Sequence, residues 1–222
     1  MSEHSLIPRV VFELGPVQVT ETVVYSLLAS ALVIAFALVV RAGLNRRATD
    51  WQIAAEFIVE HFEGVMRDML GCDPRPYTPL VATLALYIGT ANLFGLLPAM
   101  RSPTADFSTT AALAMVVFLA VPFYGIRARG LKGYLKHYLQ PTPLMLPLEL
   151  ISEFSRTLAM AVRLFGNIIS EELVIAVLLG LAGLLVPVPM MLLSILTGLV
   201  QAYIFAVLSV VYLSAAVRAQ HE

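Results

Sequence analysis

Residues 147–185 read PLELISEFSRTLAMAVRLFGNIISEELVIAVLLGLAGLL, and this stretch decides the fold of the chain. It is predominantly apolar, and it is longer than the roughly 20 residues that an upright helix needs to cross a bilayer. The stretch also contains six charged side chains, Glu149, Glu153, Arg156, Arg163, Glu171 and Glu172. Since charged groups are costly against lipid, we expect a tilted helix that protein neighbours shield.

The composition of the whole chain agrees with a membrane protein. Of 222 residues, 59% are hydrophobic and 13% are charged, against about 45–50% and about 25% in soluble domains. The net charge of −1 argues against nucleic-acid binding, which needs concentrated Lys and Arg. The single cysteine, Cys72, excludes an internal disulfide or a cysteine-based metal cluster. We expect one membrane domain over residues 1–222, with no cofactor, no metal site and no cleavable signal peptide.

Four other apolar segments are candidates for membrane-embedded helices. In chain order they cover residues 23–40, 80–97, 111–126 and 190–216. We expect the first to be a transmembrane helix and the middle two to form a transmembrane hairpin over residues 80–126. With the helix of residues 147–185, the fold class is all-α integral membrane with about five embedded helices. The last two should be long, tilted and packed as an antiparallel hairpin over residues 147–216.

Residues 50–70 have a different pattern. Apolar side chains recur there at helical spacing on one face, while mostly acidic side chains occupy the other. This pattern predicts an amphipathic helix that lies along the membrane surface. Because its polar face is acidic, we expect it to dock on protein neighbours and not on anionic lipid.

Two basic clusters predict the orientation of the chain. Arg41, Arg46 and Arg47 follow the first apolar segment, and five basic side chains follow residue 126. Basic flanks mark the cytoplasmic side of a membrane protein. Both clusters therefore place the N-terminus outside and the C-terminus in the cytoplasm.

A polar stripe runs along the helix of residues 147–185. At about 100° per residue, the polar side chains within about 80° of Arg163 include Glu149, Glu153, Arg156, Asn167, Ser170 and Glu171. Glu172 lies about 180° away and should meet a different neighbour. The final helix has a weaker stripe around Gln201, made of Ser194, Thr197, Gly198 and Tyr212. Such residues allow close helix packing and hydrogen bonds between helices.

Arg163 is the residue that most strongly indicates ion transport. An arginine at mid-membrane costs about 2.5–3.5 kcal/mol on insertion scales, so it needs a partner or a water-filled cavity. Its guanidinium stays protonated, so it can attract or block charge but should not shuttle a proton. Carboxylates can shuttle protons. A structural ion pair for Arg163, and a static salt-bridge network around Glu149, are the alternatives.

Residues 155–173, SRTLAMAVRLFGNIISEEL, resemble the signature of subunit a of the F-type ATP synthase. The resemblance extends to Asn92-Leu-Phe-Gly-Leu-Leu-Pro98, Pro103-Thr-Ala-Asp-Phe107 and Gln201-Ala-Tyr-Ile-Phe205, in family order. It implies a stator subunit, not catalytic alone, that carries protons in a bacterial inner membrane. It further implies a c-ring partner that faces residues 147–216, and contacts with peripheral-stalk b subunits.

The resemblance also implies roles for single residues. Arg163 matches the family's essential arginine, which separates two half-channels that load and unload the c-ring carboxylates. The other matched positions are Asn167 and Gln201 near the arginine, Glu172 in the external channel, Glu149 in the cytoplasmic half-channel, and Asp106 as a channel or loop acid. Glu171 departs from the family, which usually has a small residue there, and Ser194 stands where some relatives place a histidine. These departures leave the external relay group and the choice of H+ or Na+ open.

Two other functions compete with this interpretation. A self-contained secondary transporter would bind its substrate at charged groups near the midplane, but such folds usually show two related halves with broken helices, and this sequence shows none. A purely structural scaffold would use the polar stripe only for static ion pairs.

Overall fold

The computed structural model describes residues 10–14, 17–43, 50–95, 100–139, 145–182 and 186–218. Within these ranges the chain is helical apart from one short β-hairpin and the connecting loops. The helices are α1 (Glu21–Gly43), α2 (Asp50–Leu70), α3 (Thr78–Phe94), the 3-10 helix η1 (Pro103–Ala105), α4 (Phe107–Leu139), α5 (Met145–Ala182) and α6 (Pro187–Arg218). The all-α membrane class expected from the sequence is confirmed.

Four of the described helices are long and apolar enough to cross a membrane. Their apolar parts cover residues 21–41, 107–128, 146–181 and 187–217. Helix α3 is also apolar but has only 17 residues. The amphipathic helix expected at residues 50–70 is α2, which has those bounds.

The bounds of the helices differ from the expected segments, and the difference is largest in α4. Helix α4 continues past residue 126 through the basic cluster to Leu139, with a break at Gly130, where φ is 72°. Glycine tolerates this left-handed conformation without the steric cost of a Cβ atom. Helix α6 begins at Pro187 and not at residue 190. Proline fits the first turn of a helix, because the N–H groups there lack intrahelical partners.

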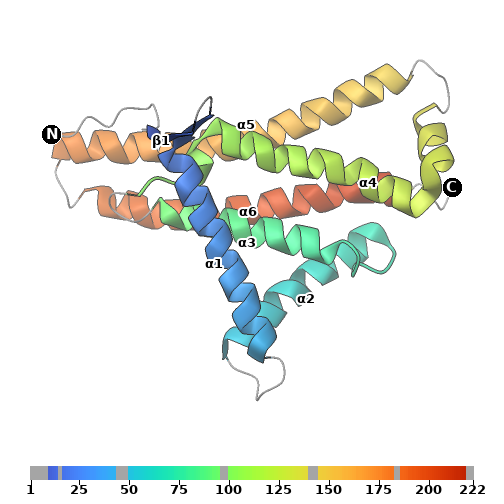
Figure 1. Ribbon diagram of the computed structural model, residues 1–222, viewed down its shortest axis with the longest axis horizontal. Coiled ribbons are helices and arrows are strands. Elements are labelled where there is room, and N and C mark those ends of the chain that lie inside the picture. Colours follow the sequence, from blue (N-terminus) through green and yellow to red (C-terminus); the bar gives the residue numbers. More distant parts are fainter. Residues whose placement is uncertain are drawn as a thin grey trace.

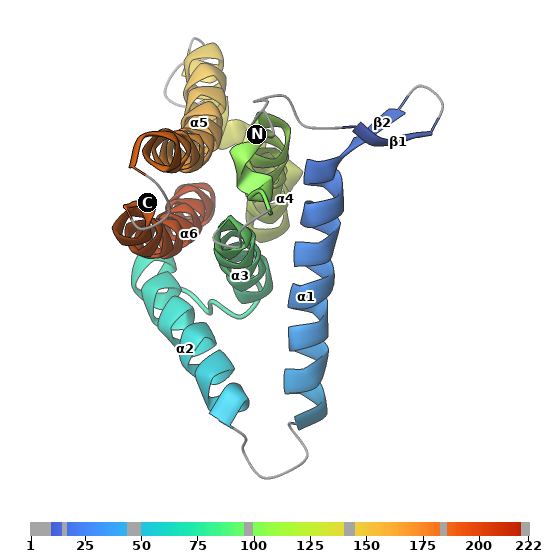
Figure 2. The same ribbon diagram turned by 90° about the vertical axis from the view of Figure 1, so that its left-hand side faces the viewer.

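Helices α3, α4, α5 and α6 run side by side, and α1 crosses them steeply at one flank (Figures 1 and 2). Helix α2 packs against α3 and α6 on the other side of the molecule. If α1 crosses the bilayer steeply, α5 and α6 are strongly tilted, as the sequence predicts. Helix α5 runs along α4 and α6, and its N-terminal half diverges from α6 (Figure 1).

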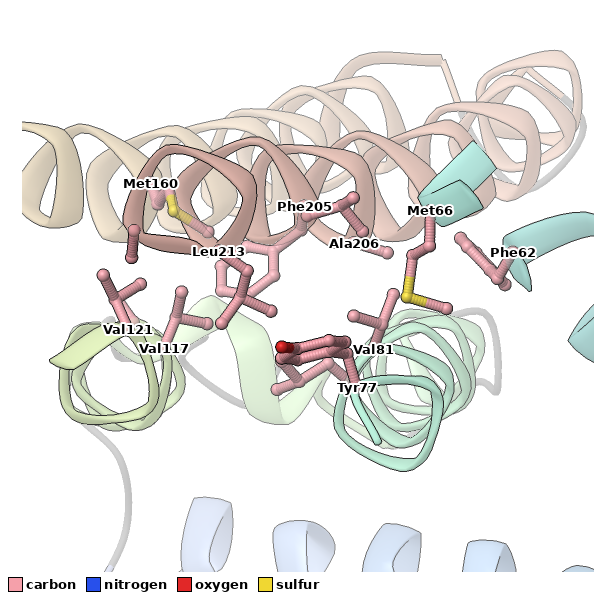
Figure 3. Close-up of a cluster of buried hydrophobic side chains, with 14 of the residues drawn as sticks. Phe62, Met66, Tyr77, Val81, Val117, Val121, Met160, Phe205, Ala206 and Leu213 are labelled. Atoms are coloured by element: carbon pink, nitrogen blue, oxygen red, sulfur yellow. The ribbon is translucent and has the colours of Figure 1, made fainter. Parts of the chain in front are cut away.

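The core lies where α2, α3, α4 and α5 meet α6 (Figure 3). Its largest fully buried side chains include Phe205 and Leu213 of α6, Met66 of α2, Met160 of α5 and Val117 of α4. Because α6 contacts each of the other four helices of this core, it is the central element that positions the functional face of α5.

A two-stranded antiparallel hairpin precedes α1. It consists of β1 (Val10–Leu14) and β2 (Val17–Thr20), with Leu14 opposite Val17. The sequence of this segment predicted no element.

Candidate functional site

Arg163 lies near the middle of α5, on an exposed face of that helix. Apolar side chains of α5 are exposed as well, and Val162, Val174 and Val177 are 50%, 42% and 58% exposed. Another side of α5 is buried through Met160, Ala161, Leu164 and Ile168. Only 11% of the most apolar window of α5 is buried within the chain, compared with 28% for α6. The face that bears Arg163 is therefore open to lipid or to a partner.

Arg163 forms no ion pair with the residues that the structure describes. A buried structural ion pair was the alternative for this residue, and no residue in the described part of the chain supplies a partner for one. The cost of placing a guanidinium in an apolar helix is therefore not offset by an ion pair within the described residues.

Asn167, one turn after Arg163, joins α5 to α6. Its Nδ2 donates a hydrogen bond of 2.9 Å to Oε1 of Gln201. Gln201 is only 3% exposed, so the contact satisfies a polar group that would otherwise be costly to bury. This bond and the contacts between the two helices confirm that the last two helices pack against each other.

Glu171 and Glu172 point to different neighbours, as the helical wheel predicts. The Glu171 carboxylate lies beside the hydroxyl groups of Ser194 and Thr197 on α6. Glu172 accepts a hydrogen bond of 3.3 Å at Oε1 from the backbone N–H of Ser102, in the loop before η1. Helix α5 thus directs one carboxylate to α6 and the next to the loop that follows α3.

A buried polar cluster lies next to Glu172. Thr104 Oγ1 donates to Asn92 Oδ1 at 2.6 Å, and Asn92 Nδ2 donates to the Gly198 carbonyl at 2.8 Å. Ser102 Oγ lies 2.6 Å from Thr104 Oγ1 and donates to the Ala91 carbonyl at 3.0 Å. These contacts connect α3, the η1 loop and α6 on the side of α5 that carries Glu172.

Glu149 lies at the other end of α5, at a cavity of about 80 Å³ between α4, α5 and α6. Glu153, Arg156 and Thr157 of α5 share the cavity wall with Tyr134 of α4 and Tyr212 of α6. Charged and hydroxyl groups from three helices therefore surround one hollow. The sequence alone does not predict this cavity beside Glu149.

The polar groups along α5 form three separate zones. At about 1.5 Å per residue, Glu149 lies about 21 Å from Arg163 along the helix axis, and Glu172 about 14 Å away in the other direction. Arg163, Asn167 and Gln201 thus lie between a polar cavity at one end and a polar loop at the other.

Asp106 has a local role in the structure. Its Oδ1 accepts hydrogen bonds from the backbone N–H and the hydroxyl group of Ser108, at 3.0 and 2.9 Å. This is the geometry of an N-cap, in which a side chain satisfies a free N–H at the start of a helix; the helix here is α4. The described contacts do not join Asp106 to Glu172 or Arg163.

Comparisons with known proteins decide the family. The profile of the ATP synthase A chain family matches residues 23–214. ATP synthase subunit a 2 of a Picosynechococcus species is 48% identical over 208 residues, which cover 93% of this chain and 89% of that protein. ATP synthase subunit a 2 of a Bradyrhizobium species is 44% identical, with 98% and 97% of the two chains covered. ATP synthase subunit a of Legionella pneumophila is 40% identical, with 100% and 96% covered.

The chain belongs to the ATP synthase subunit a family. It is therefore a multi-pass membrane subunit of the membrane sector of the F-type ATP synthase, which argues against a self-contained transporter. The resemblance drawn from RLFGN and its companion motifs is confirmed.

Some residues that the structure brings to these zones were not predicted from the sequence. Asn92 and Thr104 lie within the motifs that carry the family resemblance, but no spacing rule links them to Glu172. Tyr134 follows Gly130, which has a positive φ. This glycine was the only feature of the sequence that could have indicated the position of Tyr134. Tyr212 was assigned to the packing stripe of the last helix, and it also lines the cavity.

Proposed function

We propose that this chain is the proton-translocating stator of its ATP synthase, with Arg163 as the fixed charge between two half-channels. The observation that carries the proposal is the placement of Arg163. It is exposed on α5 and lacks an ion pair within the described residues, and it lies between the Glu149 cavity and the Glu172 loop. A charge so placed is available to a mobile partner.

The chemistry of arginine suits this role. A guanidinium keeps its charge at any physiological pH, so it attracts an ionised c-ring carboxylate without accepting or supplying a proton. At about 4 Å and an effective dielectric constant of about 20, two unit charges attract by about 4 kcal/mol. The same charge repels cations that would otherwise pass directly from one half-channel to the other. Proton flow is then coupled to rotation of the ring.

Each half-channel has a carboxylate in this proposal. Glu172 serves the external path and Glu149 serves the cytoplasmic path through the cavity of about 80 Å³. Asn167 and Gln201 hold α5 and α6 together beside the arginine. Glu171, beside Ser194 and Thr197, adds a further ionisable group on the external side. Asp106 acts by capping α4.

The exposed apolar face of α5 supports the c-ring as the partner at Arg163. Branched apolar side chains flank the arginine on that face, which fits a surface that contacts both lipid and the outer helices of a ring. Peripheral-stalk b subunits are the second proposed partner. The basic clusters predict an external N-terminus and a cytoplasmic C-terminus in the inner membrane of a bacterium.

The test replaces Arg163 by alanine in the complete ATP synthase, assayed in inside-out membrane vesicles. We expect Arg163→Ala to abolish ATP-driven proton pumping while the chain still co-purifies with the c-ring. Arg67→Ala, which removes an exposed arginine of α2, is the control and should pump normally. Normal coupled pumping by Arg163→Ala would refute the proposal.

A further inference from the structure

The loop between α3 and α4 is attached to the rest of the molecule through buried side chains. Thr104 and Ser102 are 0% and 2% exposed. The Thr104 hydroxyl proton is directed to Asn92 Oδ1, so in the short contact with Ser102 the Thr104 oxygen can only accept. The Ser102 proton is therefore shared between Thr104 Oγ1 and the Ala91 carbonyl. The three side chains form one connected unit, called here the Asn92 cluster (Asn92, Ser102 and Thr104).

The Asn92 cluster is also held by close steric contacts. A Cβ atom at Gly198 would lie 3.0 Å from Asn92 Cβ, and one at Gly95 would lie 3.2 Å from Ser102 Cβ. Both glycines therefore permit an approach that alanine would obstruct. The hydrogen bond from Asn92 to the Gly198 carbonyl runs through this close contact between α3 and α6.

The loop that the cluster holds is the loop that contacts Glu172. The side chain of Ser102 belongs to the cluster, and the backbone N–H of the same residue donates to Glu172 Oε1 at 3.3 Å. A change in the position of Ser102 therefore moves the donor to the carboxylate. No side chain of the cluster needs to contact Glu172 for this to happen.

We propose that Asn92, Ser102 and Thr104 are positioning residues that hold the Glu172 carboxylate in the orientation required for proton entry from the outside. This inference rests on the proposed role of Glu172. Proton transfer needs a partner within about 2.6–3.2 Å, directly or through one water, and a misplacement of about 1 Å can cost about a hundredfold in rate. A buried cluster that fixes the loop from α3 and α6 supplies the required rigidity.

The test measures proton flow through the membrane sector in vesicles of the complete complex after removal of its soluble part. Thr104→Val keeps the shape of the side chain but removes both hydrogen bonds, and should slow flow about tenfold or more. Thr104→Ser keeps the hydroxyl group and should restore most of the rate. Thr83→Val is the matched control, because the Thr83 hydroxyl is exposed and bonds only within its own helix.

A second comparison separates positioning from a general loss of structure. In a Glu172→Gln background, which should itself slow flow, Thr104→Val should have no further effect. If Glu172→Gln leaves no measurable flow, Glu172→Asp replaces it as the background, since its shorter carboxylate also loses the loop contact. Equal slowing by Thr104→Val with and without Glu172, or no slowing at all, would overturn the inference. An unchanged rate in Glu172→Gln alone would instead refute the proposed role of Glu172.

Gly198→Ala tests the same inference with a substitution that removes no polar group. If Thr104→Val fails to assemble with the complex, Gly198→Ala should displace Asn92 by a few tenths of an ångström and slow flow only when Glu172 is present. Gly64→Ala on α2, where an added Cβ meets nothing within 4 Å, should leave the rate unchanged. Slowing by Gly198→Ala that does not depend on Glu172 would also overturn the inference.

Discussion

Gly125 of α4 is a position where one added methyl group should have a large effect. A Cβ atom there would lie 2.5 Å from Cε2 and 2.8 Å from Cδ2 of Tyr134, and 3.5 Å from Cβ of Ala216. Tyr134 is only 7% exposed, because the chain turns at Gly130 and packs its ring back against α4. Both ring carbons are closer than van der Waals contact allows, so Gly125→Ala must displace the ring.

The cost of Gly125→Ala follows from this overlap. Overpacking a well-packed site costs about 1–3 kcal/mol, which should lower the thermal midpoint of the chain in the purified complex by about 2–10 °C. Gly180→Ala is the control, because that helical position is open. Alanine is favoured over glycine in a helix by about 0.5–1 kcal/mol, so the control should be neutral or slightly stabilising.

A double variant tests the cause of the destabilisation. In a Tyr134→Ala background the ring is absent, so Gly125→Ala should cost nothing further. The coupling between two residues in contact is typically about 0.5–3 kcal/mol. Equal effects of Gly125→Ala with and without Tyr134, or a midpoint that matches the Gly180→Ala control, would refute the reasoning. Since Tyr134 lines the Glu149 cavity, Gly125→Ala should also slow ATP-driven pumping.

Three other substitutions test the remaining zones of α5. Asn167→Leu leaves the buried Gln201 amide unpaired and should cost about 1–3 kcal/mol, measured as a lower thermal midpoint. Asn167→Leu with Gln201→Leu should recover most of that loss, and a larger loss in the double variant would contradict the contact. Glu149→Gln should slow ATP-driven pumping several-fold with assembly intact, whereas Glu56→Gln on an exposed face of α2 should not. Glu172→Gln should slow proton uptake from the outside with assembly intact, and an unchanged rate would count against its assignment.

The helices were largely predictable because their signals are local. Residues 50–70 alternate apolar and acidic side chains at helical spacing, and α2 has those bounds. The hairpin before α1 was missed, although the sequence Gly15-Pro16 between two short apolar segments is a typical turn signal. A segment this short carries too little periodicity to decide its structure, and pairing with a second strand determines it.

The functional site was predictable only in part, since a helical wheel gives the directions of side chains around one helix at a time. It separates Glu172 from Arg163, and the structure agrees, because Glu172 contacts the loop before η1. It also places Asn167 near the arginine, and the structure adds the hydrogen bond from Asn167 to Gln201. It cannot predict that the loop after α3 reaches Glu172, because residues 102 and 172 are distant in sequence. The Glu149 cavity depends in the same way on Tyr134, which reaches it only because α4 breaks at Gly130.

Glu171 and Glu172 of α5 are directed to other parts of the chain, which explains why neither carboxylate occupies the arginine of the proposed stator. A carboxylate of this chain within about 4 Å of Arg163 would attract it as strongly as a ring carboxylate does, and the site would then be occupied permanently. Glu172 lies about 180° around the helix and about 14 Å along it, where the Ser102 N–H binds it. Glu171 is closer in angle, but it lies beside α6 and its hydroxyl groups. Both acids therefore face other elements of the chain, which in the proposed function leaves the guanidinium available to a ring carboxylate.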